Sequence, residues 1–117
     1  MLVRTLIAAS MLATAAPVLA QQVAVVVVVP TPPGLPRDRI EAGMKASIPQ
    51  YEKLPGLIRK YFTIQPDGFG GMYLWKDRAS ADAWFNAAWC ERVKQTYGRD
   101  AAVSYFDVPI AIEGKSR

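Results

Sequence analysis

The most apolar part of the chain is residues 23–29, where Val23 and Ala24 are followed by five consecutive valines, Val25 to Val29. Valine is β-branched, and its restricted χ1 angle favours extended structure. Successive side chains of a strand point to opposite faces, so a strand with one solvated face should alternate apolar and polar residues. Residues 22–29 do not alternate. We therefore expect a central strand that is shielded from water on both faces.

Helical periodicity follows the valine run in two places. The first predicted helix begins near Pro36, and Pro49 should kink or split it. Its apolar positions recur at intervals of four, four and three residues: Ile40, Met44, Ile48 and Tyr51. The second helix begins at Asp77 or Ser80, either of which can serve as the N-cap, and ends at Gly98. The predicted apolar face of this helix consists of Ala81, Phe85, Ala88, Trp89, Val93 and Tyr97.

Three more strands are predicted, at residues 57–65, 70–76 and 102–108. The turn signal at Gln65-Pro66-Asp67-Gly68 joins the first two of these into a hairpin. The resulting order, β-α-β-β-α-β, is that of the ferredoxin-like α+β fold with an antiparallel sheet. In this topology the first and third strands are central. Two helices cover one face of the sheet, so we expect a second copy of the chain to cover the other face in a homodimer.

The first twenty residues have the pattern of a secretory signal peptide. Arg4 gives a positive start, residues 5–16 are apolar, Pro17 interrupts them, and cleavage is expected after Ala20. The mature domain would then be residues 21–117, periplasmic or secreted, with no stable membrane association. An uncleaved N-terminal anchor is the alternative.

Composition narrows the possible chemistry. The chain contains no histidine, which excludes a Ser-His-Asp triad, a His-based metal site and an axial His ligand to haem. The net charge of +4 comes from dispersed basic residues, so we expect no nucleic-acid partner. Cys90 is the single cysteine and can form no disulfide within the chain. A bond between chains and a reactive thiol stay open, but we expect a small buried hydrophobe.

A resemblance to a known family covers most of the mature chain. It rests on residues 55–62 (PGLIRKYF) and 70–75 (GGMYLW), on Trp89, on Tyr97-Gly98 and on residues 106–109 (FDVP). These segments resemble the YdhR-like mono-oxygenases of the dimeric α+β barrel superfamily. The resemblance implies a ligand cavity between sheet and helices in each subunit. It also implies oxygenation of an aromatic or quinol-like substrate without metal or flavin, so we expect no cofactor.

Lys60 is the candidate catalytic residue. It alternates with Ile58 and Phe62, so the three should share one face of their strand. If helices cover that face, burial would lower the pKa of Lys60 and suit it to act as a base or an oxyanion donor. The alternative is a lysine that protects an edge strand and has no catalytic role. Asp107 is a second possible general base.

Aromatic side chains are the candidate ligand contacts. We predict that a flat apolar or aromatic ligand is bound by Phe62, Tyr73, Trp75, Trp84, Trp89 and Phe106. Core packing explains the same residues equally well. Gly70-Gly71 could let the backbone approach a ligand, although a bulge or turn exit is the favoured interpretation.

Two functional hypotheses follow. The first is a cofactor-independent mono-oxygenase that acts on a small aromatic or apolar compound, with Lys60 as base or oxyanion donor. The second is a non-catalytic dimeric module that binds a small apolar ligand. The direction in which Lys60 points distinguishes them, because the enzyme needs an ionisable group inside an apolar cavity.

Overall fold

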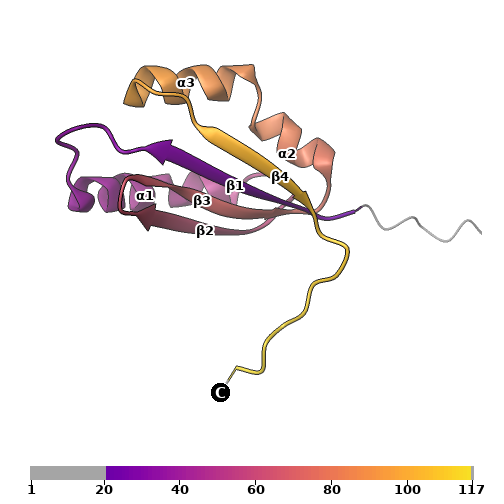
Figure 1. The fold of residues 1–117 in the computed structure, drawn as a ribbon. Helices are drawn as coiled ribbons and strands as arrows, with labels where there is room; N and C mark the ends of the chain where they lie inside the picture. The colour runs from indigo at the N-terminus through magenta and orange to yellow at the C-terminus, as the bar shows by residue number, and fades with distance from the viewer. Residues whose placement is uncertain (1–20, 117) are drawn as a thin grey trace, which may run out of the picture.

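The computed structural model describes residues 21–116 (Figure 1), and the predicted signal peptide lies outside these residues. The described chain contains four strands and three helices. They are β1 (Val23–Pro30), α1 (Arg37–Glu52), β2 (Leu57–Gln65), β3 (Gly68–Trp75), α2 (Arg78–Trp84), α3 (Ala87–Tyr97) and β4 (Ala102–Asp107). The predicted order of elements is confirmed, with the second helix divided into α2 and α3.

The four strands form one antiparallel sheet in the order β2-β3-β1-β4. Strand β1 is central, with Val25 opposite Tyr73 on β3 and opposite Tyr105 on β4. The hairpin of β2 and β3 brings Lys60 opposite Tyr73. This arrangement is the predicted ferredoxin-like α+β fold.

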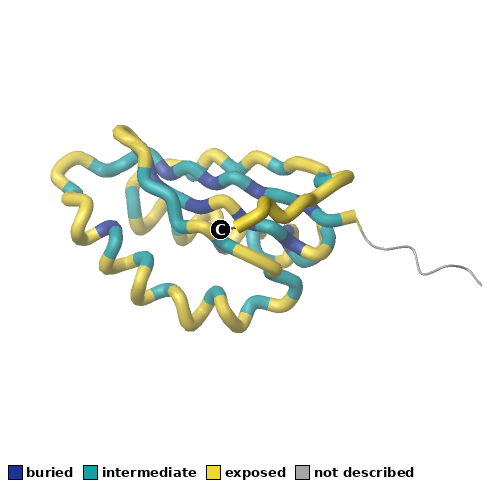
Figure 2. Tube along the Cα trace, turned by 90° about the horizontal axis from the view of Figure 1, so that it is seen from below, coloured by how far each residue is buried: buried dark blue, intermediate teal, exposed yellow. Residues whose placement is uncertain are grey.

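The valine strand is buried on alternate positions (Figure 2). Val23, Val25, Val27 and Val29 are at most 4% exposed and pack in the core with residues of the helices. Ala24, Val26 and Val28 point to the opposite face of the sheet and are half-buried. Within one chain, therefore, only one face of β1 is dry.

Helix α1 runs from Arg37 to Glu52 without interruption, so the prediction that Pro49 splits it is wrong. Pro49 lies in the last turn, where the helix loses a single backbone hydrogen bond to the missing N–H. Ser47 does not cap a new helix. Its hydroxyl donates to the carbonyl of Met44 at 2.7 Å, within the same helix.

Asn86 accounts for the division between α2 and α3. Its side chain accepts a hydrogen bond from the backbone N–H of Trp89 at 2.9 Å and so begins α3 as an N-cap. Asp77 caps α2 in the same way through Ser80 N–H at 2.8 Å. Gly98 ends α3 at φ 74°, as expected for a left-handed C-cap.

Cys90 is exposed on α3, so the expectation that it is buried is wrong. Trp89 is the residue that α3 buries, at 6% exposure. Neighbouring positions of a helix differ by about 100° around its axis, so Cys90 is turned away from the core.

A bulge at the start of β2 interrupts its regular pairing. The pairing with β3 shifts between Leu57 and Arg59. Ile58 is 49% exposed and does not line the cavity under the helices, although it borders a separate groove together with Lys60 and Phe62. Phe62 and Lys60 both line that cavity, so these two share the covered face as predicted.

The face of the sheet opposite the helices carries apolar side chains without a cover from this chain. Met72 and Phe106 are 50% and 52% exposed, beside the half-buried Val26 and Leu74. The segment after β4 runs away from the helices (Figure 1), and its Ile110 is 81% exposed. The homodimer stays a prediction that this open face supports. Among residues 21–116, no helix has the length and apolar character needed to cross a bilayer.

Gly70 lies where β3 passes close to β1. A Cβ added there would stand 1.9 Å from the carbonyl oxygen of Val27, a backbone atom that cannot move without breaking the sheet. We expect Gly70→Ala to lower the free energy of unfolding by about 2–3 kcal/mol, measured by urea denaturation. Gly43→Ala on α1 is the matched control, because nothing lies within 4 Å of its Cβ and alanine favours helix by about 1 kcal/mol. Equal stability of the two variants would contradict this account of the sheet.

Candidate functional site

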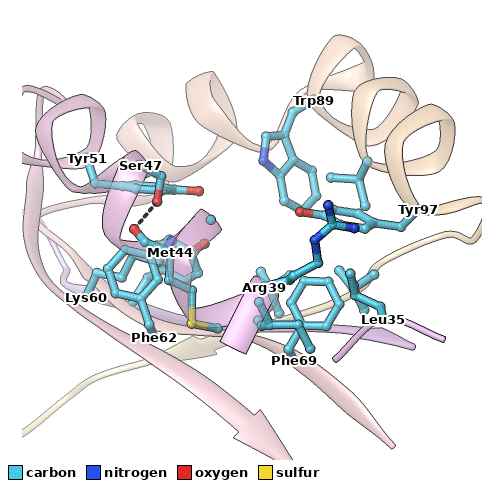
Figure 3. Close-up of a pocket in the computed structure, with 17 residues that line it drawn as sticks. Leu35, Arg39, Met44, Ser47, Tyr51, Lys60, Phe62, Phe69, Trp89 and Tyr97 are labelled. Atoms are coloured by element: carbon cyan, nitrogen blue, oxygen red, sulfur yellow. Dashed lines mark hydrogen bonds between the residues drawn. The ribbon is translucent and has the colours of Figure 1, made fainter. Parts of the chain in front are cut away.

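A cavity of about 250 Å³ lies between α1, α3 and the covered face of the sheet (Figure 3). Helix α1 contributes Met44 and Tyr51, and α3 contributes Trp89 and Tyr97. The floor comes from strands whose alternation points these side chains toward the helices: Val27, Val29, Lys60, Phe62, Phe69 and Tyr73. The volume is close to the lower end of the range for small-molecule sites, so the cavity suits a compact ligand.

Lys60 lies at one end of this cavity, inside a cage of aromatic rings. Its Nζ is 3.2 Å from the ring centroid of Tyr51, 4.1 Å from that of Phe62 and 4.6 Å from that of Tyr73. Each distance is within the range of a cation–π contact. The rings also pack on one another, since Tyr51 meets Phe62 edge to face at 5.7 Å. Lys60 therefore points into an apolar site, as the enzyme hypothesis requires.

Two opposing effects set the protonation of Lys60. Burial lowers its pKa to about 7, because an ammonium loses hydration in the cavity. The negative faces of the surrounding rings attract the ammonium and act in the other direction. Within residues 21–116 the ion pairs are Arg37–Glu41 and Arg78–Asp82, so no carboxylate neutralises Lys60. A lysine in this state can exchange a proton near neutral pH.

The tyrosines of the cage stay protonated. Burial raises the pKa of Tyr51 and raises that of Tyr73 well beyond its ordinary value. Neutral phenols are hydrogen-bond donors as well as acceptors. The cavity therefore combines a titratable amine with two hydroxyl groups from separate elements, α1 and β3.

Four of the predicted site residues line the cavity: Lys60, Phe62, Tyr73 and Trp89. Three others do not. Trp75 is fully buried in the core, and together with Trp84 it borders a separate shallow groove beside α2. Phe106 points from β4 to the open face of the sheet, because Tyr105 is the residue of that pair that faces the helices. The predicted cavity contacts of Trp75, Trp84 and Phe106 are thus corrected.

The remaining sequence candidates are also placed. Asp107 is exposed at the end of β4 and does not line the cavity. Gly70 and Gly71 lie in regular pairing with Val28 and Val27, so the expected bulge or turn exit is wrong. A Cβ on Gly71 would stand 3.0 Å from Cε of Lys60, which shows that this glycine leaves room for the lysine side chain.

Sequence reasoning missed several residues of the cavity. The sequence pattern places Tyr51 only in an apolar stripe, and it indicates no ligand site at Arg39, Phe69 or Tyr97. The helical spacing of apolar residues is the sequence feature that could have found them. A helix face that is directed toward the sheet also lines any cavity between the helix and the sheet. Among the described residues, no group of three acidic or cysteine side chains gathers as a metal site.

Comparison with known proteins gives similarity in structure alone. No family model matches the chain, and no curated protein matches it in sequence. A protein of unknown function from Nitrosomonas europaea has a similar structure, with a TM-score of 0.65 and 16% identity over 84% of this chain and 99% of that one.

Two further similar structures have described activities. A heme-degrading protein from Mycobacterium tuberculosis, heme-free, gives a TM-score of 0.57 and 16% identity over 81% of this chain and 99% of that one. A monooxygenase from Streptomyces coelicolor, in complex with nanaomycin D, gives 0.58 and 15% identity over 82% and 94%. The chain therefore has an α+β fold of the type found in monooxygenases and heme-degrading proteins. At this identity the likeness defines the fold and assigns no activity.

The depressed pKa of Lys60 makes the stability of the protein depend on pH. Between pH 7 and 10.5 the unfolded chain binds more protons at this lysine than the folded chain does, so the free energy of unfolding rises with pH. We expect Lys60→Met to stabilise the fold by about 1–2 kcal/mol at pH 7, because methionine removes the cost of burying the amine. This advantage should shrink toward pH 10, as measured by urea denaturation. The exposed Lys45→Met is the control, and a constant advantage at all pH values would contradict the assignment.

Proposed function

We propose that this protein is a cofactor-independent mono-oxygenase that acts on a small hydroxyaromatic compound. The observation that carries the proposal is the position of the Lys60 amine, inside an aromatic-lined cavity and without a carboxylate partner. The similar fold of a monooxygenase supports it. This chain can supply no histidine ligand to heme, since it has no histidine.

The first step is removal of a proton from the substrate. A neutral Lys60 takes the acidic proton of the hydroxyaromatic compound, and the resulting anion carries negative charge on oxygen and on a ring carbon. A pKa near the working pH suits a group that must accept and then return a proton. Tyr51 and Tyr73 line the same cavity, and their neutral hydroxyls would donate hydrogen bonds to the anion.

Dioxygen then reacts at the ring carbon, and the substrate supplies all the electrons. The carbon forms a bond to one oxygen atom, and the peroxide anion takes a proton back from the Lys60 ammonium. The O–O bond of this hydroperoxide breaks as the remaining hydrogen on carbon leaves. The ring C–H, the hydroxyl O–H and O₂ thus become two C=O groups and H₂O, a four-electron oxidation that needs no external reductant. The apolar walls exclude water from the reactive anion.

The second candidate is a non-catalytic module that binds a small apolar ligand. It shares the cavity and the aromatic walls with the enzyme. The buried position of Lys60 favours the enzyme. A lysine without a carboxylate partner lowers the stability of the fold, and a site that only binds an apolar ligand needs no such lysine. A periplasmic or secreted location is proposed for either function and rests on residues 1–20.

We further propose that the working form is a homodimer that buries the open face of the sheet. Val26, Met72 and Phe106 would lie at the centre of such an interface. Burial of apolar area yields about 25 cal/mol for each Å², and the same patch on both partners makes a self-complementary contact. Closure of this face would also hold the sheet, and with it Lys60, in one conformation.

Replacement of Lys60 tests the mechanism. We expect Lys60→Met and Lys60→Arg to lower the rate of oxygen uptake by 100-fold or more with a panel of phenols, naphthols and anthrones, because neither residue accepts a proton. In the unmodified protein kcat/KM should rise with pH to a plateau, with a midpoint near pH 7, because the neutral amine of Lys60 is the active form. Oxygen uptake measured with an electrode over pH 6–10 gives both the rates of the variants and the pH profile of the unmodified protein.

Lys45→Met, which removes an exposed lysine from α1, controls for the loss of charge. Unchanged uptake in Lys60→Met would remove this lysine from the mechanism. Ligand binding without any oxygen uptake by the unmodified protein would instead favour the non-catalytic module.

The dimer is tested by a charge on the open face. We expect sedimentation equilibrium to give a dimer for the unmodified protein and at least a 100-fold weaker association for Met72→Glu, since a carboxylate would be buried without a partner. Ala46→Glu, on the exposed side of α1, should leave the association unchanged. A stable monomer at micromolar concentration in the unmodified protein would overturn the proposed assembly.

A further inference from the structure

A second basic side chain borders the cavity and is exposed to solvent at the end opposite Lys60. Arg39 of α1 lines this end, and Figure 3 shows its side chain extending across the cavity toward Tyr97 and Trp89. Lys60 lies on the other side of the view, beside Tyr51 and Phe62. Between Lys60 and Arg39 the walls are mainly apolar and aromatic, with Ser47 as a polar exception. The side chains that line the cavity include no aspartate or glutamate.

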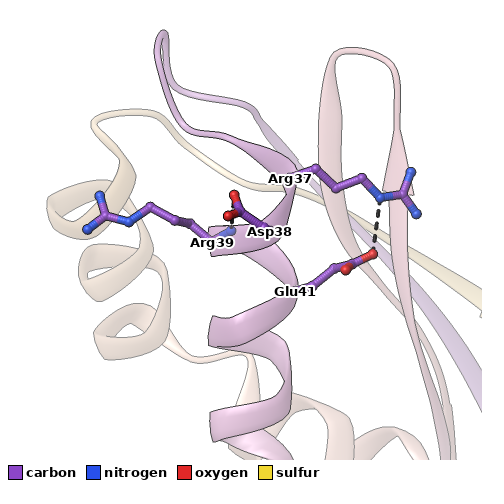
Figure 4. A network of polar contacts seen from close by, with 4 residues as sticks. All are labelled: Arg37, Asp38, Arg39 and Glu41. Carbon is purple, nitrogen blue, oxygen red and sulfur yellow. Dashed lines mark hydrogen bonds and ion pairs between the residues drawn. The ribbon is translucent and has the colours of Figure 1, made fainter.

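Arg39 is free to bind a ligand from this position. Its side chain takes part in neither of the two ion pairs in the described part of the chain. The carboxylate of Asp38 accepts a hydrogen bond from the backbone N–H of Arg39 at 3.0 Å, and no contact joins it to the guanidinium. Arg37, two residues earlier, differs because it pairs with Glu41 at 3.1 Å on the opposite side of α1 (Figure 4).

From this geometry we infer that the ligand is an aromatic acid, with a carboxylate bound by Arg39 at the cavity mouth and a ring hydroxyl directed at Lys60. The inference rests on the proposed function and narrows its substrate class. A guanidinium binds a carboxylate through two parallel hydrogen bonds, which fixes direction as well as position. Phe69 and Tyr97 pack edge to face at 5.0 Å between centroids and form an apolar wall beside this end.

An anionic ligand also explains why no acidic side chain lines the cavity, since a carboxylate in the wall would repel the ligand. A neutral phenol would satisfy Lys60 alone and leave Arg39 solvated at the mouth. An aromatic acid interacts with both basic side chains, through its hydroxyl at Lys60 and its carboxylate at Arg39, and its rings span the apolar space between them. The ligand is thereby held with its hydroxyl end inward, which is the orientation that the proposed proton transfer needs.

A pair of probes that differ in one group tests this inference: 6-hydroxy-2-naphthoate and 2-naphthol, titrated by calorimetry. We expect the unmodified protein to bind the acid about tenfold more tightly than the naphthol. Arg39→Gln should remove this preference and weaken binding of the acid by about tenfold, with little effect on the naphthol. Arg37→Gln is the control with the same loss of charge on the same helix, and it should leave both affinities unchanged.

Three results would overturn the inference: equal affinity of the unmodified protein for the two probes, no binding of either below 1 mM, or an equal effect of Arg37→Gln and Arg39→Gln. The third result would show a general charge effect and no site. Oxygen uptake is a separate readout. Retained preference for the acid without uptake would refute oxygenation and keep the ligand class, whereas Lys60-dependent uptake without preference would do the reverse.

Discussion

Register between the valine strand and its neighbours determines where the site can form. Val25 of β1 packs against the helices and lies opposite Tyr73 of β3, which in turn lies opposite Lys60 of β2. The burial of alternate valines thus places the lysine on the covered face through two successive pairings. Side chains alternate with a period of two, so a slip of one residue would turn Lys60 to the open face. Sheet stability and cavity chemistry depend on the same alignment.

Burial of Lys60 in its aromatic cage lowers the stability of the fold but keeps the amine able to act as a base. Desolvation of an amine without a carboxylate partner opposes folding, and the rings of Tyr51, Phe62 and Tyr73 return part of that cost by cation–π attraction. A carboxylate in place of one ring would hold the amine protonated and unable to act as a base. The aromatic residues therefore have an electrostatic role in addition to their packing.

Much of the fold could be predicted from the sequence, because strand alternation, turn residues and caps are local signals. The strand order follows from the element order, and the central place of the valine strand from its composition. The site was only partly predictable. Strand β4 has adjacent aromatic residues, Tyr105 and Phe106, which point to opposite faces of the sheet. Only the pairing with β1 shows that Phe106 is the one that points away from the helices. Arg39 carries no sequence signal, since its role depends on how α1 and α3 enclose space above the sheet.

The two basic side chains of the cavity come from different kinds of element. Lys60 belongs to a strand whose position is fixed by hydrogen bonds to its neighbour β3, whereas Arg39 belongs to helix α1, which touches the sheet only through side chains. Substitutions on the helices can alter the mouth without disturbing the strands. Related proteins with this fold can change substrate through substitutions at the cavity mouth and still keep Lys60. Substrate selectivity and reactivity can therefore evolve separately.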